Sequence, residues 1–160
     1  MKTYELKLKI NAPARKVVAA VTTKEYAEAE ALADGAFAAS SRVEKKGEKV
    51  VAIITDRTDP SRSPTGKKDP HKKEKCTITS EWNLETLRSE WKTKVPGMER
   101  IVKIAGSTWI EPDGDCCVYR EKGTVSIGVP LIGAVIEKAI VADIVSGFPR
   151  KKSIIEKMTS

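Results

Sequence analysis

A carboxylate and a phenol share one face of a predicted strand near the C-terminal third of the chain. Residues 116–127 alternate with a period of two, and setting Ile127 inward places Tyr119 and Glu121 on the same apolar face. Burial of an unpaired carboxylate is costly and raises its pKa toward values useful for proton transfer. Glu121 is therefore the candidate acid–base residue, and Tyr119 could orient a ligand through its hydroxyl. The alternatives are a solvated Glu121 at a rim and a Tyr119 that only packs at an edge.

Further side chains of the same character lie on neighbouring predicted strands. Two tryptophans and several hydroxyls fall on the inward faces, together with an isoleucine: Trp82, Ser89, Trp91, Thr93, Ile104 and Thr108. Trp82 and Trp91 could stack on a planar ligand, or they could pack in the core. Trp109 alternates outward, where it could anchor a dimer.

The sequence lacks the residues that triad, zinc and phosphate-binding sites usually require. His71 is the only histidine, so a Ser-His-Asp triad would have to use it, and its Pro- and Lys-rich surroundings predict a loop. The three cysteines form no CxxC pair, which leaves a zinc site without its usual ligands. Glycine-rich phosphate loops and a nucleophile elbow are absent as well. We therefore expect no metal and no cofactor.

The elements that would position these residues are mostly strands. Alternation, helical periodicity and turn residues predict a strand at 4–10, helices at about 13–21 and 24–33, and strands at 38–45, 49–57, 75–82, 87–95, 100–110 and 116–127. Their short connections favour antiparallel pairing. Residues 58–73, rich in Pro, Gly, Ser and Lys, predict a mobile basic loop.

The last thirty residues predict a long helix. Its apolar stripe consists of Leu131, Ile132, Val135, Ile136, Ala139, Ile140 and Ile144. Pro149 should end or kink this helix because proline removes one hydrogen bond and clashes with the preceding turn. A short final helix over residues 151–158 is expected to follow.

The composition is that of one folded domain with a basic surface. The 160 residues are 40% hydrophobic and 32% charged, and the formal net charge is +7. Such a charge suits nucleic acid or anionic membranes, or simply a solvated surface. The basic segment from Lys67 to Lys75 lacks interleaved aromatics, which makes nucleic acid unlikely and favours transient contact with an anionic membrane. No signal-peptide or membrane-spanning run is present, so we expect a cytoplasmic protein.

Two motifs connect this order of elements to a known superfamily. They are Gly-Ser-Thr-Trp-Ile-Glu-Pro at residues 106–112 and Gly-Val-Pro-Leu-Ile-Gly at residues 128–133, the second followed by Glu137-Lys138. The chain resembles the helix-grip fold of the START and birch-pollen-allergen superfamily (SRPBCC), nearest to a branch of uncharacterised domains. The resemblance implies an α+β fold over residues 1–160. A seven-stranded antiparallel sheet would wrap around a long C-terminal helix, with two short helices after the first strand.

The same resemblance implies a binding function. Such domains hold lipid-, sterol- or polyketide-like molecules between the sheet and the helix, and a few relatives are cyclases, aromatases or hydrolases. We expect ligand contacts from the inward residues above and from the C-terminal helix, through Val135, Ile136, Ala139 and Ile140. A non-catalytic carrier or sensor of an apolar or amphipathic molecule is the first hypothesis. The alternatives are a cyclase, dehydratase or hydrolase using Glu121, perhaps with Tyr119, and a surface binder acting through the basic segment.

Overall fold

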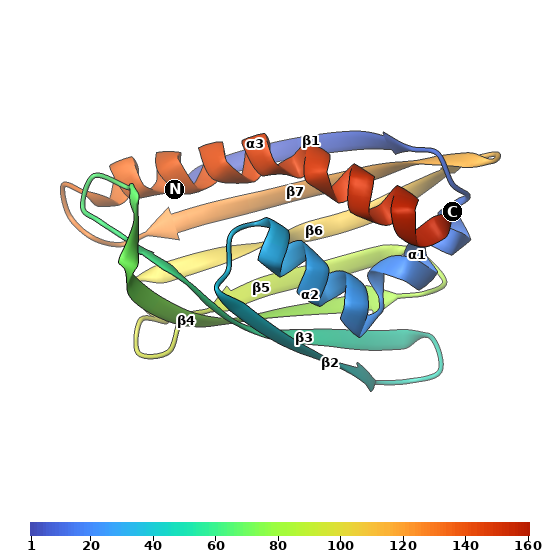
Figure 1. Ribbon diagram of the computed structural model, residues 1–160, viewed down its shortest axis with the longest axis horizontal. Coiled ribbons are helices and arrows are strands. Elements are labelled where there is room, and N and C mark those ends of the chain that lie inside the picture. The colour runs from blue at the N-terminus through green and yellow to red at the C-terminus, as the bar shows by residue number, and fades with distance from the viewer.

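The chain forms one curved antiparallel sheet and three helices (Figure 1). The computed structural model describes residues 1–160. In chain order the elements are β1 (Lys2–Ile10), α1 (Ala14–Val21), α2 (Lys24–Ala33), β2 (Ala38–Lys45), β3 (Val50–Arg62), β4 (Lys68–Asn83), β5 (Arg88–Lys94), β6 (Val102–Asp113), β7 (Cys116–Ile127) and α3 (Gly133–Thr159). The strand order is β1-β7-β6-β5-β4-β3-β2, so β1 and β2 are the two edges. The predicted α+β helix-grip architecture, with seven antiparallel strands, is confirmed.

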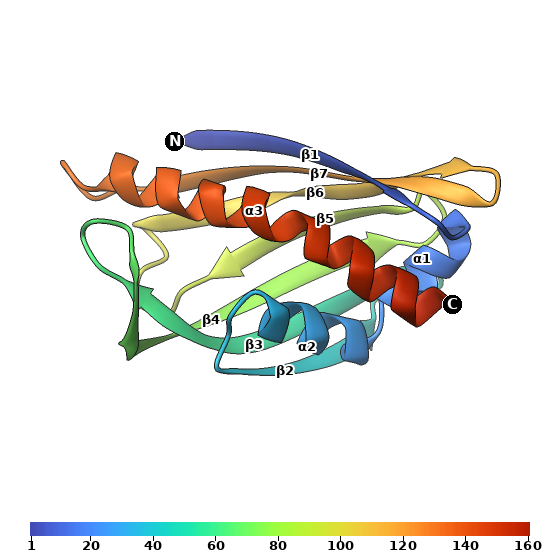
Figure 2. The ribbon, with the colours of Figure 1, turned by 45° about the horizontal axis from the view of Figure 1, so that its top comes forward.

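The sheet curves around α3, and the two short helices lie at the side that α3 leaves open (Figure 2). Pro13 precedes the first turn of α1 with φ −62°, a value its ring imposes and the helix accepts. Thr23 caps α2, since its side-chain oxygen accepts a hydrogen bond from the Tyr26 amide at 3.1 Å. These local signals explain why both helices begin where the sequence indicates.

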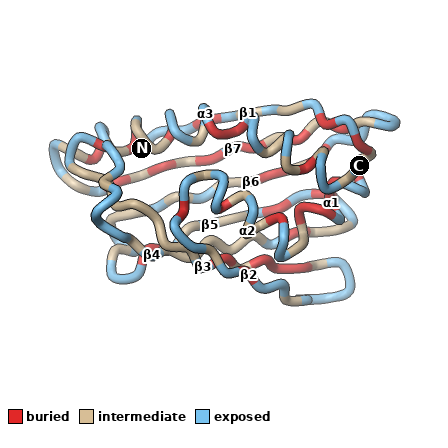
Figure 3. Tube along the Cα trace, in the orientation of Figure 1, coloured by how far each residue is buried: buried red, intermediate tan, exposed pale blue.

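Two packed clusters join α3 to the sheet, one toward each end of the helix. The larger places Phe148 and Ile155 of α3 with Val17 of α1 and Tyr119 of β7, whereas the smaller places Val141 against Val125. The buried positions follow the inner strand faces, and exposed positions gather at the hairpins (Figure 3). No helix is long and apolar enough to cross a membrane.

The loop predicted over residues 58–73 is wrong. The ladder between β3 and β4 continues to Arg62 opposite Lys68, leaving only a short turn in which Gly66 has φ +86°. Proline is tolerated here because β2 ends opposite Thr58, so Pro60 lies at an open edge where its missing N–H breaks no ladder. A register shift after Pro60 accommodates Pro70. His71 therefore lies on β4, where it is exposed.

The predicted end of the C-terminal helix at Pro149 and the separate final helix are also wrong. One helix runs from Gly133 to Thr159 with Pro149 inside it. Pro149 and the Val145 side chain are both exposed, so water can hydrate the Val145 carbonyl that loses its partner. The preceding residue, Phe148, is buried against Tyr119 with ring centroids 5.9 Å apart, and this contact holds the helix on the sheet.

Candidate functional site

A pocket of about 630 Å³ lies between the concave face of the sheet, α2 and α3. About half of its lining residues are hydrophobic, 21 of 41, so a ligand would meet apolar and polar walls. Ile104, Ile136 and Ile140 belong to the apolar part, which α3 closes from above. The volume matches the range of small-molecule sites in proteins.

The residues predicted to line a cavity divide into two groups. Those on the wall of the pocket are Trp82, Ser89, Trp91, Thr93, Ile104, Thr108, Tyr119, Glu121, Ile136 and Ile140. Val135 and Ala139 are not among the lining residues, so their predicted placement is wrong. Val135 is 46% exposed, and Ala139 packs beneath the β3–β4 turn, where a Cβ on Gly66 would lie 2.7 Å from its methyl group. Of the predicted apolar stripe, only Ile136, Ile140 and Ile144 line the pocket.

Glu121 is buried, as the period of β7 predicts, and its carboxylate is already paired. Tyr4 of β1 donates a hydrogen bond from its hydroxyl to Oε2 of Glu121 at 2.9 Å. Gly123 makes this contact possible, because the Tyr4 ring lies over it at a place where a Cβ would come within 2.6 Å of the phenol carbons. Burial, followed by the charge of Glu121, raises the pKa of Tyr4 well above its ordinary value. Tyr4 is therefore a neutral donor at physiological pH.

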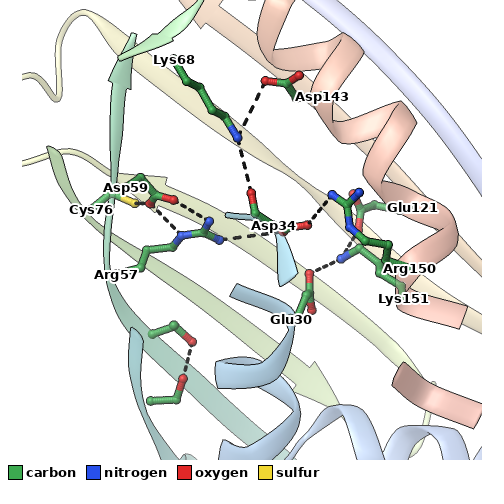
Figure 4. Close-up of polar contacts among 12 residues, drawn as sticks. Glu30, Asp34, Arg57, Asp59, Lys68, Cys76, Glu121, Asp143, Arg150 and Lys151 are labelled. Atoms are coloured by element: carbon green, nitrogen blue, oxygen red, sulfur yellow. Dashed lines mark hydrogen bonds and ion pairs between the residues drawn. The ribbon is translucent and has the colours of Figure 1, made fainter. Parts of the chain in front are cut away.

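Lys151 of α3 supplies the cation for the same carboxylate. Its Nζ lies 3.7 Å from Oε1 of Glu121 and forms an ion pair with Glu30 of α2. Burial alone would lower the pKa of Lys151, but Glu30 and Glu121 outweigh it and hold that pKa well above the usual range. Likewise, burial would raise the pKa of Glu30, and the Lys151 charge lowers it instead. Figure 4 shows these groups meeting between α2, α3 and the sheet.

A second group of charges continues along the same wall. Arg57 of β3 donates two hydrogen bonds to Asp59, at 2.8 and 2.7 Å, and its Nη1 lies 4.0 Å from Asp34 at the end of α2. The Cys76 thiol donates to the same Asp59 at 3.6 Å. Burial, and then the Asp59 charge, raises the pKa of Cys76 to about 12, so the thiol stays protonated and is a poor nucleophile.

The chemistry of this wall follows from the protonation states of its lysine and tyrosine side chains. We call Tyr4, Glu30, Glu121 and Lys151 the ionic cluster. Lys151 is a protonated donor, and the phenols of Tyr4 and Tyr119 are neutral, because burial raises the pKa of Tyr119 as well. A ligand oxygen at this end of the pocket would therefore meet hydrogen-bond donors, whereas a charged ligand group would have to displace an existing ion pair.

The sequence did not indicate Lys151 or Glu30 as site residues. Lys151 lies one helical turn after Phe148 and two turns after Ile144, both on the wall of the pocket. This spacing identifies Lys151 once the helix is continued through Pro149. Glu30 gives no comparable signal, because α2 is only weakly amphipathic and several glutamates alternate along it. Arg57 also lines the pocket, beside its exposed neighbour Asp56.

Other candidates lie away from the pocket. Trp109 is on the outer face, as predicted, where it donates to Glu111 at 3.2 Å and Arg88 lies 5.0 Å from its ring. A wider depression of about 920 Å³ on that face has only three hydrophobic residues among 15, so it lacks an apolar wall. No group of three or more His, Cys, Asp or Glu is arranged to hold a metal ion.

Comparison with known proteins places the chain in a family. Residues 5–158 match the family described as "Protein of unknown function (DUF2505)". The chain belongs to this family. No curated protein matches the sequence. The DUF2505 match includes all or most of every element that lines the pocket, although it begins one residue after Tyr4.

Solved structures share the fold at low sequence identity. TTHA0849 from Thermus thermophilus superposes with a TM-score of 0.71 at 12% identity, covering 99% of this chain and 97% of that one. The Zhui aromatase/cyclase from Streptomyces sp. R1128 gives 0.60 at 10% identity, with 99% and 93% covered. Norcoclaurine synthase from Thalictrum flavum, in complex with dopamine and hydroxybenzaldehyde, gives 0.62 at 14% identity, with 95% and 84% covered. The chain thus has the helix-grip fold that these structures share.

Proposed function

We propose that this protein binds an apolar or amphipathic small molecule in the pocket between the sheet and α3, as a carrier or sensor. The observation that carries the proposal is the pocket itself: about 630 Å³, with isoleucines from β6 and α3 on its apolar part and the ionic cluster on its polar part. An amphipathic ligand fits both parts, because its apolar body is removed from water while one oxygen accepts from Lys151 or a phenol. Two structural relatives are, by name, an aromatase/cyclase and a synthase bound to small aromatic molecules.

The state of Glu121 favours binding over catalysis. An acid–base residue must exchange a proton with its substrate, and so needs a free oxygen within hydrogen-bond reach. Oε2 of Glu121 accepts a hydrogen bond from Tyr4 at 2.9 Å, and Oε1 lies 3.7 Å from the Lys151 cation as its ion-pair partner. A proton added to this carboxylate would remove the charge that pairs with Lys151, whereas ligand binding requires no change in the pair.

A titration with the fluorescent probe N-phenyl-1-naphthylamine tests the binding proposal. Thr93 faces the pocket, and its neighbour Lys92 is exposed on the outer face of β5. Thr93→Trp should fill the pocket and weaken probe binding about tenfold or more, while Lys92→Trp should bind like the wild type. A wild-type protein that is folded but takes up no probe would overturn the proposal, as would equal affinity in the two variants.

The second candidate function is a cyclase, dehydratase or hydrolase that uses Glu121 as acid and base. It is favoured by one observation, the buried position of Glu121 on the pocket wall. Glu121→Gln separates the two functions, since glutamine keeps the shape and can still accept from Tyr4. A carrier should keep its affinity for the bound molecule within about threefold, whereas an enzyme should lose turnover of that molecule by about 10² or more.

A further inference from the structure

One end of the molecule exposes apolar side chains, and lysine and arginine side chains without ion-pair partners surround them. Three connections meet there: the β3–β4 turn (residues 63–67), the β5–β6 turn (95–101), and the segment from β7 into α3 (128–138). The Gly128 amide donates to the Ile101 carbonyl at 2.8 Å, and Gly66 packs on the backbone of Val135 and Ile136, so the three are in contact. Figures 1 and 2 both place them at one end, together with the N-terminus. We call this surface the loop end.

Leu131 in the loop end is unfavourable in two independent ways. Its φ is +70°, a left-handed conformation in which a leucine Cβ is crowded and which glycine or asparagine adopts more easily. Its side chain is also 98% exposed, the highest value among the large hydrophobic residues of the chain. Neither the backbone nor the side chain gains a contact that offsets this cost within the isolated protein. Such a position indicates a surface that acquires its partner only on binding.

Leu131 has apolar neighbours and a rim on which exposed cations outnumber exposed carboxylates by three to one. Met1 is 82% exposed, and its amino group pairs with Glu137 at 3.0 Å, which fixes it beside the start of α3. Val135 is exposed in the first turn of that helix. The exposed cations on the three connections are Lys67, Arg100 and Lys138, and none has an ion-pair partner; the only exposed carboxylate there is that of Glu99.

We propose that the loop end docks on the surface of an anionic lipid bilayer, with Leu131 entering the headgroup region and the cationic rim contacting lipid headgroups. Exposed aliphatic side chains within a basic rim are the combination that binds such surfaces, because apolar burial and attraction to anionic lipid add together. The pocket reaches the same end, since Met98 of the β5–β6 turn and Val129 of the β7–α3 segment line it. Docking would bring the pocket to the place where amphipathic molecules are dissolved.

Flotation with lipid vesicles tests this docking, and it does not depend on the identity of the pocket's ligand. The wild type should float with phosphatidylcholine vesicles that contain about a third phosphatidylglycerol, and much less with phosphatidylcholine alone. Raising the salt from about 50 mM to about 500 mM should weaken binding, because it screens the rim. Absence of the wild type from the anionic vesicles at low salt would overturn the proposal and leave a protein partner as the occupant.

Matched variants separate the loop end from general surface charge and hydrophobicity. Leu131→Asn should lower vesicle affinity about tenfold while leaving the Tm unchanged or higher, since asparagine tolerates the left-handed backbone. Val43→Thr, at an exposed valine on β2, should have no effect. Lys67→Glu should weaken binding more than Lys45→Glu, whose lysine is also exposed and unpaired but lies at the far end of β2. Wild-type affinity in Leu131→Asn, or equal loss in the two lysine variants, would contradict the proposal.

Discussion

At the scale of single residues, Lys151 is the group on which the pocket's charges depend. It faces two carboxylates, the buried Glu121 and the half-buried Glu30, and has only 14% of its side chain exposed. Removing one partner of a buried ion pair leaves an uncompensated charge, and this costs more than the pair itself contributes. Lys151→Met should therefore destabilise the fold by about 3–5 kcal/mol at pH 7, as measured by urea unfolding.

The pH dependence of that variant distinguishes charge from packing. In the wild type the pKa of Glu30 is lowered, so its contribution to stability is present above the ordinary carboxyl pKa and is lost as the pH falls through the lowered value. Lys151→Met lacks the cation, so its deficit relative to the wild type should shrink between about pH 7 and about pH 4 as Glu30 takes up a proton. Lys152→Met, next along α3 and 37% exposed, should cost about 1 kcal/mol or less. A deficit for Lys151→Met that is constant with pH would point to packing alone.

We predict that the stability of the fold depends on Gly123, because the Tyr4 ring packs directly on it. A Cβ there would meet the Tyr4 ring at 2.6 Å, so Gly123→Ala should displace Tyr4 and break its hydrogen bond to Glu121. We expect a loss of about 1–3 kcal/mol in the free energy of unfolding, from overpacking and the lost bond. Gly47→Ala is the control, because nothing lies within 4 Å of a Cβ at that turn. Equal stability of the two variants would show that Tyr4 can move without cost.

The sequence predicts on which face of its strand each site residue lies, but not which residues of other elements it contacts. The period of two places Glu121, Tyr119 and Trp91 on the inner face, because a one-residue slip would turn every apolar neighbour outward. What pairs with Glu121 depends on β1 and α3, which are far away in the sequence and reach it only through the curvature of the sheet. The partners Tyr4 and Lys151 therefore came from the structure, although alternation along β1 already turns Tyr4 to the correct face.

At the scale of elements, Pro149 tests the continuity of α3. A proline inside a helix removes one hydrogen bond and clashes with the preceding turn, at a cost of about 3 kcal/mol relative to alanine in a regular interior. Pro149→Ala should therefore raise the free energy of unfolding by about 1–3 kcal/mol, detected by thermal unfolding. Ser153→Ala, at an exposed position of the same helix, should add only the difference in helix propensity, about 0.5 kcal/mol. A gain no larger than that of the control would mean that the helix is interrupted at Pro149.

The elements that the sequence predicted least well contain proline. Both helices after the first strand and the strands at 38–45 and 116–127 have the predicted bounds, because capping residues and alternation are local. The ends of β3 and β4 hold Pro60 and Pro70, and the middle of α3 holds Pro149. In each case the tertiary setting, an open edge, a register shift or a hydrated helix face, allows the element to continue through the proline. A local pattern cannot report that setting.

At the scale of the whole molecule, the curved sheet, α3 and α2 enclose one pocket, which has the ionic cluster on its wall and the loop end at one extremity. This arrangement divides the proposed roles: the pocket would select the small molecule, and the loop end would select the surface from which it is loaded. The two can be varied separately, because Thr93 and Leu131 belong to different elements and only Thr93 lines the pocket. Thr93→Trp should therefore keep vesicle binding while it loses the probe, and Leu131→Asn should show the reverse in co-flotation and titration.

The central claim is that the pocket holds a small molecule, and native mass spectrometry of the freshly purified protein tests it most directly. We predict a population heavier than the chain by one small-molecule mass, near-stoichiometric, released on denaturation into an apolar extract and absent from Thr93→Trp. The wild type and Thr93→Trp both appearing only at the bare mass of the chain, under conditions that preserve non-covalent complexes, would contradict the account.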